Sequence, residues 1–188
     1  TCESMAYDLR ALGYTAHAIH NHSGDFYDRA HVFSNLGFDT FTSVEYMQNV
    51  QRNPIGWAKD SVLTAEILKA LGSTPGEDFI YTISVQAHGQ YPKDAEHEME
   101  TSTPFSEDDR RAAFAYYLSQ IKEVDTFLGE LTNALERYGH PTVLVLFGDH
   151  LPSLGLTEED LPGGDLYATP YVIWSNTGLT APNRSLEA

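Results

Sequence analysis

Four short apolar runs, separated by helical patterns, limit the fold of this chain more than any other feature. The runs cover residues 14–20, 79–87, 142–147 and 171–174. The last three are rich in β-branched and aromatic residues and do not alternate cleanly between apolar and polar positions, which is typical of strands covered on both faces of a sheet. We therefore expect four largely buried strands, with His17 of the first run and Trp57 as packed core residues.

Helical patterns lie between these runs, over residues 4–12, 60–71 and 106–138. The second pattern has Asp60 as its expected N-cap and Gly72 directly after its end. Strands that alternate with helices predict an α/β fold, in which a largely parallel sheet is sandwiched between helices. A chain of 188 residues can form one domain or one large piece of a domain.

A histidine stands at the end of each of the first three predicted strands. The first strand ends in HNHSGDFYDR (residues 20–29), the second in HGQYP (88–92) and the third in GDH (148–150). Ligands of open α/β sheets bind beyond the carboxyl ends of the strands. If the strands are parallel, these three segments would face one pocket.

Each segment also has an ordinary structural interpretation. Asp149 and His150 are residue types that bind Zn²⁺ or Mn²⁺, but they could instead form a turn in which the carboxylate caps the next segment. Arg29 can donate two parallel hydrogen bonds to a phosphate or sulfate, or it can pair with a neighbouring aspartate on the surface. His88 could contact a ligand or be a solvated histidine at a strand end.

The charge of the chain limits its partners. It has 11 Lys and Arg against 27 Asp and Glu, a formal net charge of -16. A nucleic-acid-binding module of this size needs a basic face, so we expect no nucleic acid partner. The same charge repels a phosphate substrate, which would need local cations such as a metal ion. One cysteine allows no internal disulfide, and no run reaches the roughly 18 apolar residues of a membrane span.

The order of the segments resembles the lipoteichoic acid synthase group of the sulfatase and alkaline phosphatase superfamily. The resemblance is carried by HNHSGDFYDR, NLGFDTF, SVQAHGQYP, LFGDHLPSLG and TPYVIWSN, which follow one another between residues 9 and 176. It implies a sulfatase-like α/β fold that is incomplete at its N-terminus. Residues 1–188 would then be the C-terminal portion of a catalytic domain.

The resemblance also implies roles for individual residues. Asp149 and His150 would be metal ligands, the metal being Mn²⁺ in this group or another divalent cation such as Mg²⁺ or Zn²⁺. His88 and Arg29 would be catalytic: His88 would contact the phosphate of the substrate or of the covalent intermediate, and Arg29 would bind the phosphate oxygens. His20 would bind the glycerol phosphate head.

Two positions depart from the group. His22 stands where the group often has Asp, and Tyr27 stands where it often has Trp. Both are expected to contact the substrate, and an aromatic side chain at Tyr27 preserves a packing wall. The group places its nucleophilic Thr and a further acidic ligand upstream of the first helix, so we expect this chain to hold half of the metal site and not the attacking group.

The implied activity is a metal-dependent transfer of glycerol phosphate from phosphatidylglycerol to a polyglycerolphosphate or related cell-envelope acceptor. It would proceed through an ester on the upstream Thr, at the extracellular face of a bacterial membrane, with a membrane anchor N-terminal to this chain. We expect this chain alone to be inactive. Two alternatives stay open: a sulfatase or phosphoesterase that transfers to water, and a non-catalytic ligand-binding module.

Overall fold

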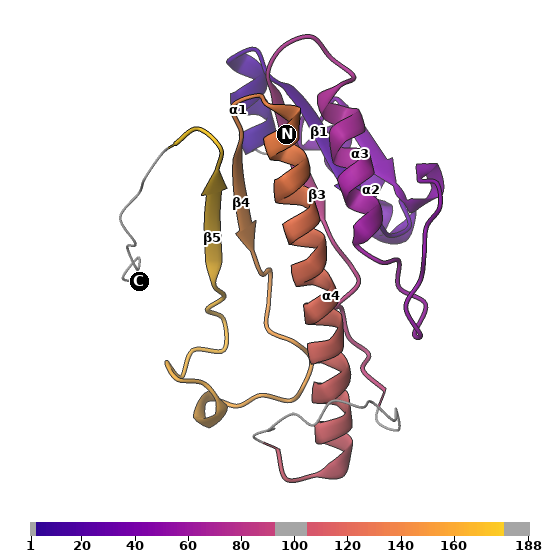
Figure 1. Cartoon of the computed structure of the whole chain (residues 1–188), viewed down its shortest axis with the longest axis vertical. Coiled ribbons are helices and arrows are strands. Elements are labelled where there is room, and N and C mark those ends of the chain that lie inside the picture. Colours follow the sequence, from indigo (N-terminus) through magenta and orange to yellow (C-terminus); the bar gives the residue numbers. More distant parts are fainter. Residues whose placement is uncertain (1–2, 93–104, 179–188) are drawn as a thin grey trace. The chain divides into compact units, whose positions relative to one another are not determined.

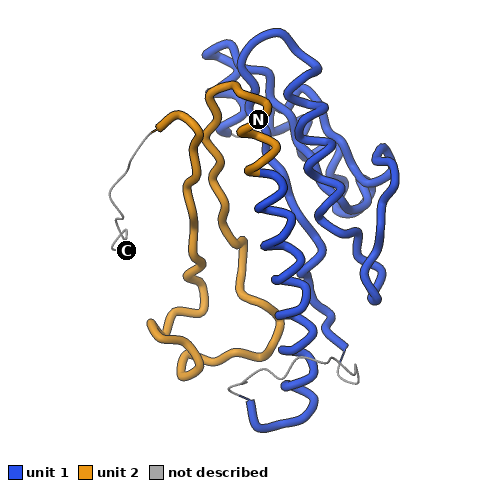
Figure 2. The backbone as a smooth tube through the Cα atoms, in the orientation of Figure 1, with its two compact units in different colours: residues 1–131 blue, residues 132–188 orange. Residues whose placement is uncertain are grey.

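The computed structural model describes residues 3–92 and 105–178. The chain divides into two compact units, residues 1–131 and residues 132–188, which Figure 2 shows in different colours. Strands and helices alternate along the chain (Figure 1), and the predicted α/β fold is confirmed.

A three-stranded parallel sheet forms the centre of the first unit. It consists of β1 (Thr15–His20), β2 (Thr40–Ser43) and β3 (Asp78–Ile83), in the order β2-β1-β3. Both outer strands run parallel to β1. The carboxyl ends of all three strands therefore lie at the same edge of the sheet.

Helices and 3-10 turns precede or connect these strands. They are α1 (Met5–Ala11), the 3-10 turn η1 (Phe26–Asp28), α2 (Arg29–Asn35), the 3-10 turn η2 (Val44–Tyr46) and α3 (Ser61–Leu71). Of these, α1, α2 and α3 pack against the sheet. The long helix α4 (Asp108–Tyr138) begins in the first unit and ends in the second. The hydroxyl of Ser4 caps α1 by accepting the backbone N–H of Tyr7. Asp60 is the N-cap residue of α3, as expected, but its side chain makes no capping hydrogen bond.

Small residues in the central strand make room for an aromatic cluster. Ala16 and Ala18 are fully buried in β1. On the same face, Ala18 lies opposite Phe41 of β2 and Tyr81 of β3. The cluster consists of Phe33, Phe38, Phe41, Phe79 and Tyr81, with ring centroids 4.8 to 6.3 Å apart. It holds α2 and the loop after it against the sheet.

His17 is a buried structural residue of this sheet, as predicted. It is 2% exposed, and its Nδ1 lies 2.8 Å from the Thr40 hydroxyl of β2. Its Nε2 lies 3.1 Å from the Asp78 carboxylate of β3. The Thr74 hydroxyl donates a further hydrogen bond to Asp78 at 2.6 Å. The imidazole thus joins the three strands near their amino ends, and its polar atoms are satisfied inside the core.

The second unit contains a two-stranded antiparallel sheet of β4 (Val143–Phe147) and β5 (Tyr171–Ser175). The 3-10 turn η3 (Glu158–Asp160) lies in the connection between the strands. Val145, Phe147 and Ile173 are half exposed or more. Within this chain the two strands are therefore not covered on both faces, and they run antiparallel, which an apolar run does not fix.

Sequence patterns missed two short elements. Strand β2 has four residues, and α2 has Phe33 as its buried residue. Four residues are too few to show the alternation of a strand. The second predicted strand also ends earlier than expected, at Ile83, and residues 84–88 continue as an irregular segment. No helix in the described part of the chain is long and apolar enough to cross a membrane.

Candidate active site at the carboxyl ends of β1 and β3

The first unit brings three of the predicted histidines to one edge of its sheet. His20 is the last residue of β1, and His22 follows two residues later. His88 ends the irregular segment after β3. The ring centroids of His20 and His22 lie 5.9 Å apart. Trp57 stands between the two strand ends, 5.3 Å from the His22 ring and 5.6 Å from the His88 ring.

Arg29 provides the cation of this site. Its Nη1 donates to Nδ1 of His22 and to the carbonyl oxygen of Ser23, both at 2.8 Å. Among the ion pairs of the described residues, Arg29 has none with a neighbouring aspartate, and Asp28 pairs with His31 at 2.7 Å. The structure therefore favours the interpretation of Arg29 as a cation aimed at the strand ends over that of a surface ion pair.

The hydrogen-bond partners fix which ring nitrogens carry protons. Arginine can only donate, so the bond from Arg29 leaves His22 with its proton on Nε2. Carbonyl oxygens can only accept, so His20 donates from Nδ1 to Ile83 at 2.9 Å, and His88 donates from Nδ1 to Gly89 at 2.6 Å. The site thus offers an N–H donor at His22 and an imidazole lone pair on Nε2 of His20.

Burial and Arg29 keep two of the imidazoles neutral. Burial, helped by the nearby Arg29 charge, lowers the pKa of His20 from 6.5 to about 4. The same two causes lower the pKa of His22. At neutral pH the guanidinium of Arg29 is therefore a fixed positive charge beside neutral imidazoles, an arrangement that suits a phosphate or sulfate group.

The loop that carries Arg29 is held in an unusual conformation. Tyr27 and Asp28 both have positive φ angles, 57° and 54°, which non-glycine residues rarely adopt. Glu45 secures the start of the loop by accepting the N–H of Gly24 at 3.2 and 3.3 Å. Hydrogen bonds, first from Ser43, lower the pKa of Glu45 to about 2. Tyr27 is 79% exposed as a result of this turn.

The predicted metal ligands Asp149 and His150 follow β4 in the second unit. Their Oδ2 and Nε2 atoms lie 3.7 Å apart, close enough for both to bind one ion. His150 donates from Nδ1 to the carbonyl oxygen of Leu151 at 2.8 Å. This bond places the lone pair on Nε2, in the way that a carbonyl partner orients a metal-binding histidine. Within the described residues, no group of three or more His, Cys, Asp or Glu side chains could hold a metal ion.

Trp57 is the site residue that sequence reasoning missed. It was expected in the core, yet it is only partly buried, between His22 and His88. It lies in a loop closed by Asn53, whose backbone N–H donates to the Trp57 carbonyl at 2.8 Å. The contacts of Trp57 with His22 and His88 join residues more than 30 positions apart, so no local sequence pattern indicates them.

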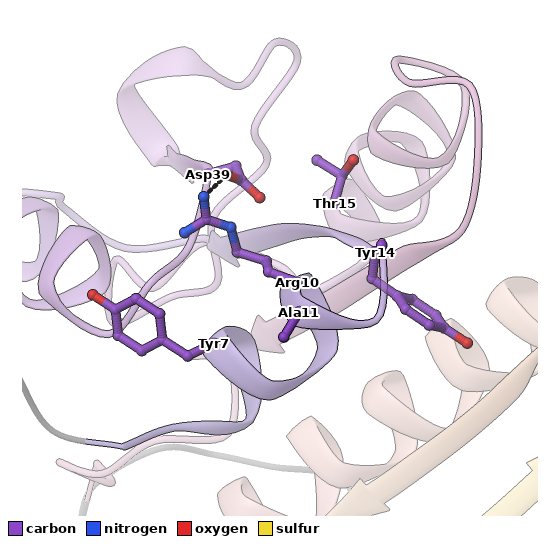
Figure 3. A pocket seen from close by; sticks show the side chains of 7 residues that line it. Tyr7, Arg10, Ala11, Tyr14, Thr15 and Asp39 are labelled. Carbon is purple, nitrogen blue, oxygen red and sulfur yellow. Dashed lines mark ion pairs between the residues drawn. The ribbon is translucent and has the colours of Figure 1, made fainter.

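A hollow at the opposite edge of the sheet is a weaker candidate (Figure 3). It lies at the amino end of β1 and is lined by residues of α1 and by Asp39. Its one cation, Arg10, pairs with Asp39 at 3.0 Å and also donates to the carbonyl oxygen of Gly37 at 3.0 Å. These contacts fasten α1 to the loop before β2 and engage the charge that a ligand would need.

Comparison with known protein families identifies the family of the chain. The family model named Sulfatase matches residues 1–187. The chain belongs to the sulfatase family. Over 97% of its length it is 32% identical to a candidate cyclic beta-1,2-glucan modification protein of Rhizobium meliloti, and over 82% it is 22% identical to the capsular polysaccharide biosynthesis protein RkpI of the same organism. It spans 31% and 27% of those two proteins.

Solved structures show the same fold. The phosphoglycerol transferase GacH of Streptococcus pyogenes, in complex with sn-glycerol-1-phosphate, matches 91% of the chain with a TM-score of 0.75 and 23% identity. The lipoteichoic acid synthase LtaP of Listeria monocytogenes matches 91% with a TM-score of 0.66 and 21% identity. The C-terminal periplasmic domain of EcEptC from Escherichia coli, a zinc complex, matches 94% with a TM-score of 0.66 and 17% identity. The chain covers 46%, 45% and 53% of these structures.

Proposed function

We propose that this chain is the C-terminal portion of the catalytic domain of a phosphoglycerol transferase that modifies a cell-envelope glycan. The observation that carries the proposal is the cationic Arg29 beside the neutral His20 and His22 at the carboxyl edge of a sulfatase-family sheet. Two structures of the same fold support the proposal: GacH is a phosphoglycerol transferase in complex with sn-glycerol-1-phosphate, and LtaP is a lipoteichoic acid synthase.

The residues of the first unit would bind the glycerol phosphate group. Arg29 would neutralise phosphate oxygens, and the Nε2–H of His22 would donate to them. Nε2 of His20 would accept a hydrogen bond from a glycerol hydroxyl. His88 would contact the transferred phosphoryl group, with Trp57 packed against its ring. Tyr27 would form an exposed wall of the same site.

Asp149 and His150 would contribute to a divalent metal site, for which their residue types and the 3.7 Å separation of their donor atoms are suitable. A bound Mn²⁺, Mg²⁺ or Zn²⁺ would lower the pKa of the attacking alcohol and stabilise the negative charge of the phosphate during transfer. The zinc complex of EcEptC supports a divalent ion in this fold. The remaining ligands and the nucleophilic Thr would come from outside this chain.

The donor and the acceptor are inferred from the named relatives. Phosphatidylglycerol is the proposed donor because the group transferred would be glycerol phosphate. The relative named for cyclic beta-1,2-glucan modification, at 32% identity, favours a glucan over a polyglycerolphosphate chain as the acceptor. The enzyme would then act on the outer side of the cytoplasmic membrane, as the periplasmic domain of EcEptC suggests.

A transfer assay with the full-length protein tests this function. Phosphatidylglycerol labelled in its head-group glycerol is incubated with Mn²⁺ and a cyclic β-1,2-glucan, and the label is followed by chromatography. We expect label on the glucan. Label released as free glycerol phosphate, with or without the glucan, would indicate a hydrolase instead. Binding of sn-glycerol-1-phosphate without any turnover would indicate a non-catalytic module.

A further inference from the structure

We infer that Asp60 is a positioning residue that holds the carboxyl ends of β1 and β3 together and thereby fixes the histidines of the candidate site. Nothing in the sequence pattern suggested this role, because Asp60 reads as a helix N-cap. The kinetic consequence of the inference rests on the proposed function. Its structural consequence can be measured without any activity.

The contacts of Asp60 run to the strand ends instead of to its own helix. The residue is fully buried, at 0% exposure. Its Oδ1 accepts the side-chain N–H of Asn21 at 2.7 Å and the backbone N–H groups of Gln86 and Val85 at 3.2 and 3.3 Å. The backbone N–H of Asp60 donates to Oε1 of Gln86 at 2.8 Å. One carboxylate oxygen therefore receives three N–H groups.

The donors of these bonds flank the site histidines. Asn21 stands between His20 and His22, and its side chain also donates to the Ala58 carbonyl at 3.3 Å. Gln86 lies two residues before His88. β1 and β3 are paired through their last residues, His20 and Ile83, and beyond these residues the sheet ends. Beyond the last hydrogen-bonded pair of the sheet, the Asp60 carboxylate continues the link between the segments that follow β1 and β3.

The same network reaches the Trp57 loop and helix α4. The side chain of Gln86 donates to Gln120 at 3.2 Å and to Glu123 at 2.6 Å. The side-chain amide of Asn53 donates to Gln120 and to the Gln86 backbone carbonyl, both at 3.1 Å, while its oxygen accepts the N–H of Trp57 at 2.9 Å. The loop that places Trp57 against the histidines is thus fixed to the same residue, Gln86, that Asp60 holds.

Burial and hydrogen bonding act on the Asp60 carboxylate in opposite directions. Burial raises the pKa of Asp60, with the hydrogen bonds from Asn21, Gln86 and Val85 opposing the rise. The side chain of Ser84, the residue after β3, adds a further hydrogen bond to the same carboxylate.

Asp78 offers a matched control at the other end of the same sheet. Its side chain is 3% exposed and, like Asp60, it accepts several hydrogen bonds, from Thr74 and His17. It lies at the amino end of β3, whereas Asp60 holds the carboxyl end. A general loss of stability would follow from removing either carboxylate, but only Asp60 is linked to the site histidines.

Histidine footprinting with diethylpyrocarbonate, read by mass spectrometry, tests the placement in the full-length protein. His20 and His17, both on β1, are 3% and 2% exposed. Asp60→Ala should raise the modification rate of His20 by about tenfold through local opening of the strand end, and leave that of His17 within about twofold. Asp78→Asn should do the reverse. Asp60→Asn keeps an oxygen acceptor and should give a smaller increase in the modification rate of His20. This variant provides the test if Asp60→Ala does not fold.

Kinetics under the proposed transfer assay provide the second measurement. At a temperature where every variant is folded, Asp60→Ala should lower kcat/KM by about tenfold or more, while Asp78→Asn stays within about twofold of wild type. Equal losses in the two variants, or an unchanged modification rate at His20, would overturn the positioning role. A wild-type protein without transfer activity would instead reject the proposed function, and the footprinting would still decide the role of Asp60.

Discussion

At the scale of single residues, the site depends on one cation and on imidazoles that stay neutral. The net charge of the chain is -16, so a phosphate must be attracted locally. Arg29 is the proposed source of this attraction, and its bonds to His22 and Ser23 direct its guanidinium to the strand ends. Lysine could supply the charge but not the forked geometry.

Substitution of Arg29 should therefore weaken transfer strongly. Arg29→Ala should lower kcat/KM by about 10- to 100-fold, the equivalent of the roughly 1.5–3 kcal/mol carried by hydrogen bonds to a charged group. Arg29→Lys should recover part of the loss. Arg10→Ala, which removes a cation paired with Asp39 at the opposite edge of the sheet, is the control and should leave kcat/KM near wild type. A loss below about threefold in Arg29→Ala would argue against phosphate binding by this residue.

The low pKa of His20 should appear as a pH dependence of stability. The pKa is about 4 in the folded protein and 6.5 in the reference state, so between these values the unfolded chain binds more protons. The free energy of unfolding should fall as the pH falls from about 6.5 to about 4. His20→Asn keeps a donor for the Ile83 carbonyl and should flatten this slope in urea unfolding curves. A slope that His20→Asn leaves unchanged would contradict the burial of a neutral His20.

The sequence could anticipate some of these residues and not others. His20, His22, Arg29 and His88 follow strands, so the rule for parallel sheets was enough to expect them at one edge. Trp57 and Asp60 could not be foreseen in the same way. Trp57 meets histidines more than 30 positions away, and Asp60 is hydrogen-bonded to residues 25 to 39 positions away, so no local pattern records either contact.

At the scale of elements, apolar runs and helix patterns predicted most of the fold. Helices α1, α3 and α4 and strands β1, β4 and β5 lie close to their predicted positions, and β3 begins close to its predicted start. Strand β2 and helix α2 were missed because each is short and depends on the aromatic cluster for its stability. The antiparallel direction of β5 depends on the path of the connection after β4, which apolar periodicity does not encode.

The aromatic cluster should therefore be the main anchor of α2. Phe33 is 6% exposed and contacts the rings of Phe38, Phe41 and Tyr81. Phe33→Ala should reduce the free energy of unfolding by about 3–5 kcal/mol, as is usual for a buried aromatic. Val32→Ala, next to it in the helix and 46% exposed, should cost far less. Similar losses for both variants in urea unfolding would show that α2 is not held by this cluster.

At the scale of the whole molecule, the chain spans less than a third of its curated relatives and about half of the solved structures that it matches. Membership in the sulfatase family is nevertheless carried by almost every residue, 1–187. The phosphate-binding candidates lie in the first unit and the metal-binding candidates in the second.

Metal dependence is the prediction that joins these parts. In the full-length protein, Asp149→Asn should abolish the Mn²⁺-dependent transfer, because Asp149 and His150 would both be ligands of the ion. Glu159→Gln, which changes an exposed carboxylate in the same unit, should transfer at the wild-type rate. Calorimetry adds a measurement without turnover: Mn²⁺ should bind the full-length protein tightly and the isolated 188-residue chain weakly, since two ligands hold a divalent ion poorly. Tight stoichiometric binding by the isolated chain, or full activity of Asp149→Asn, would mean that the metal lies elsewhere.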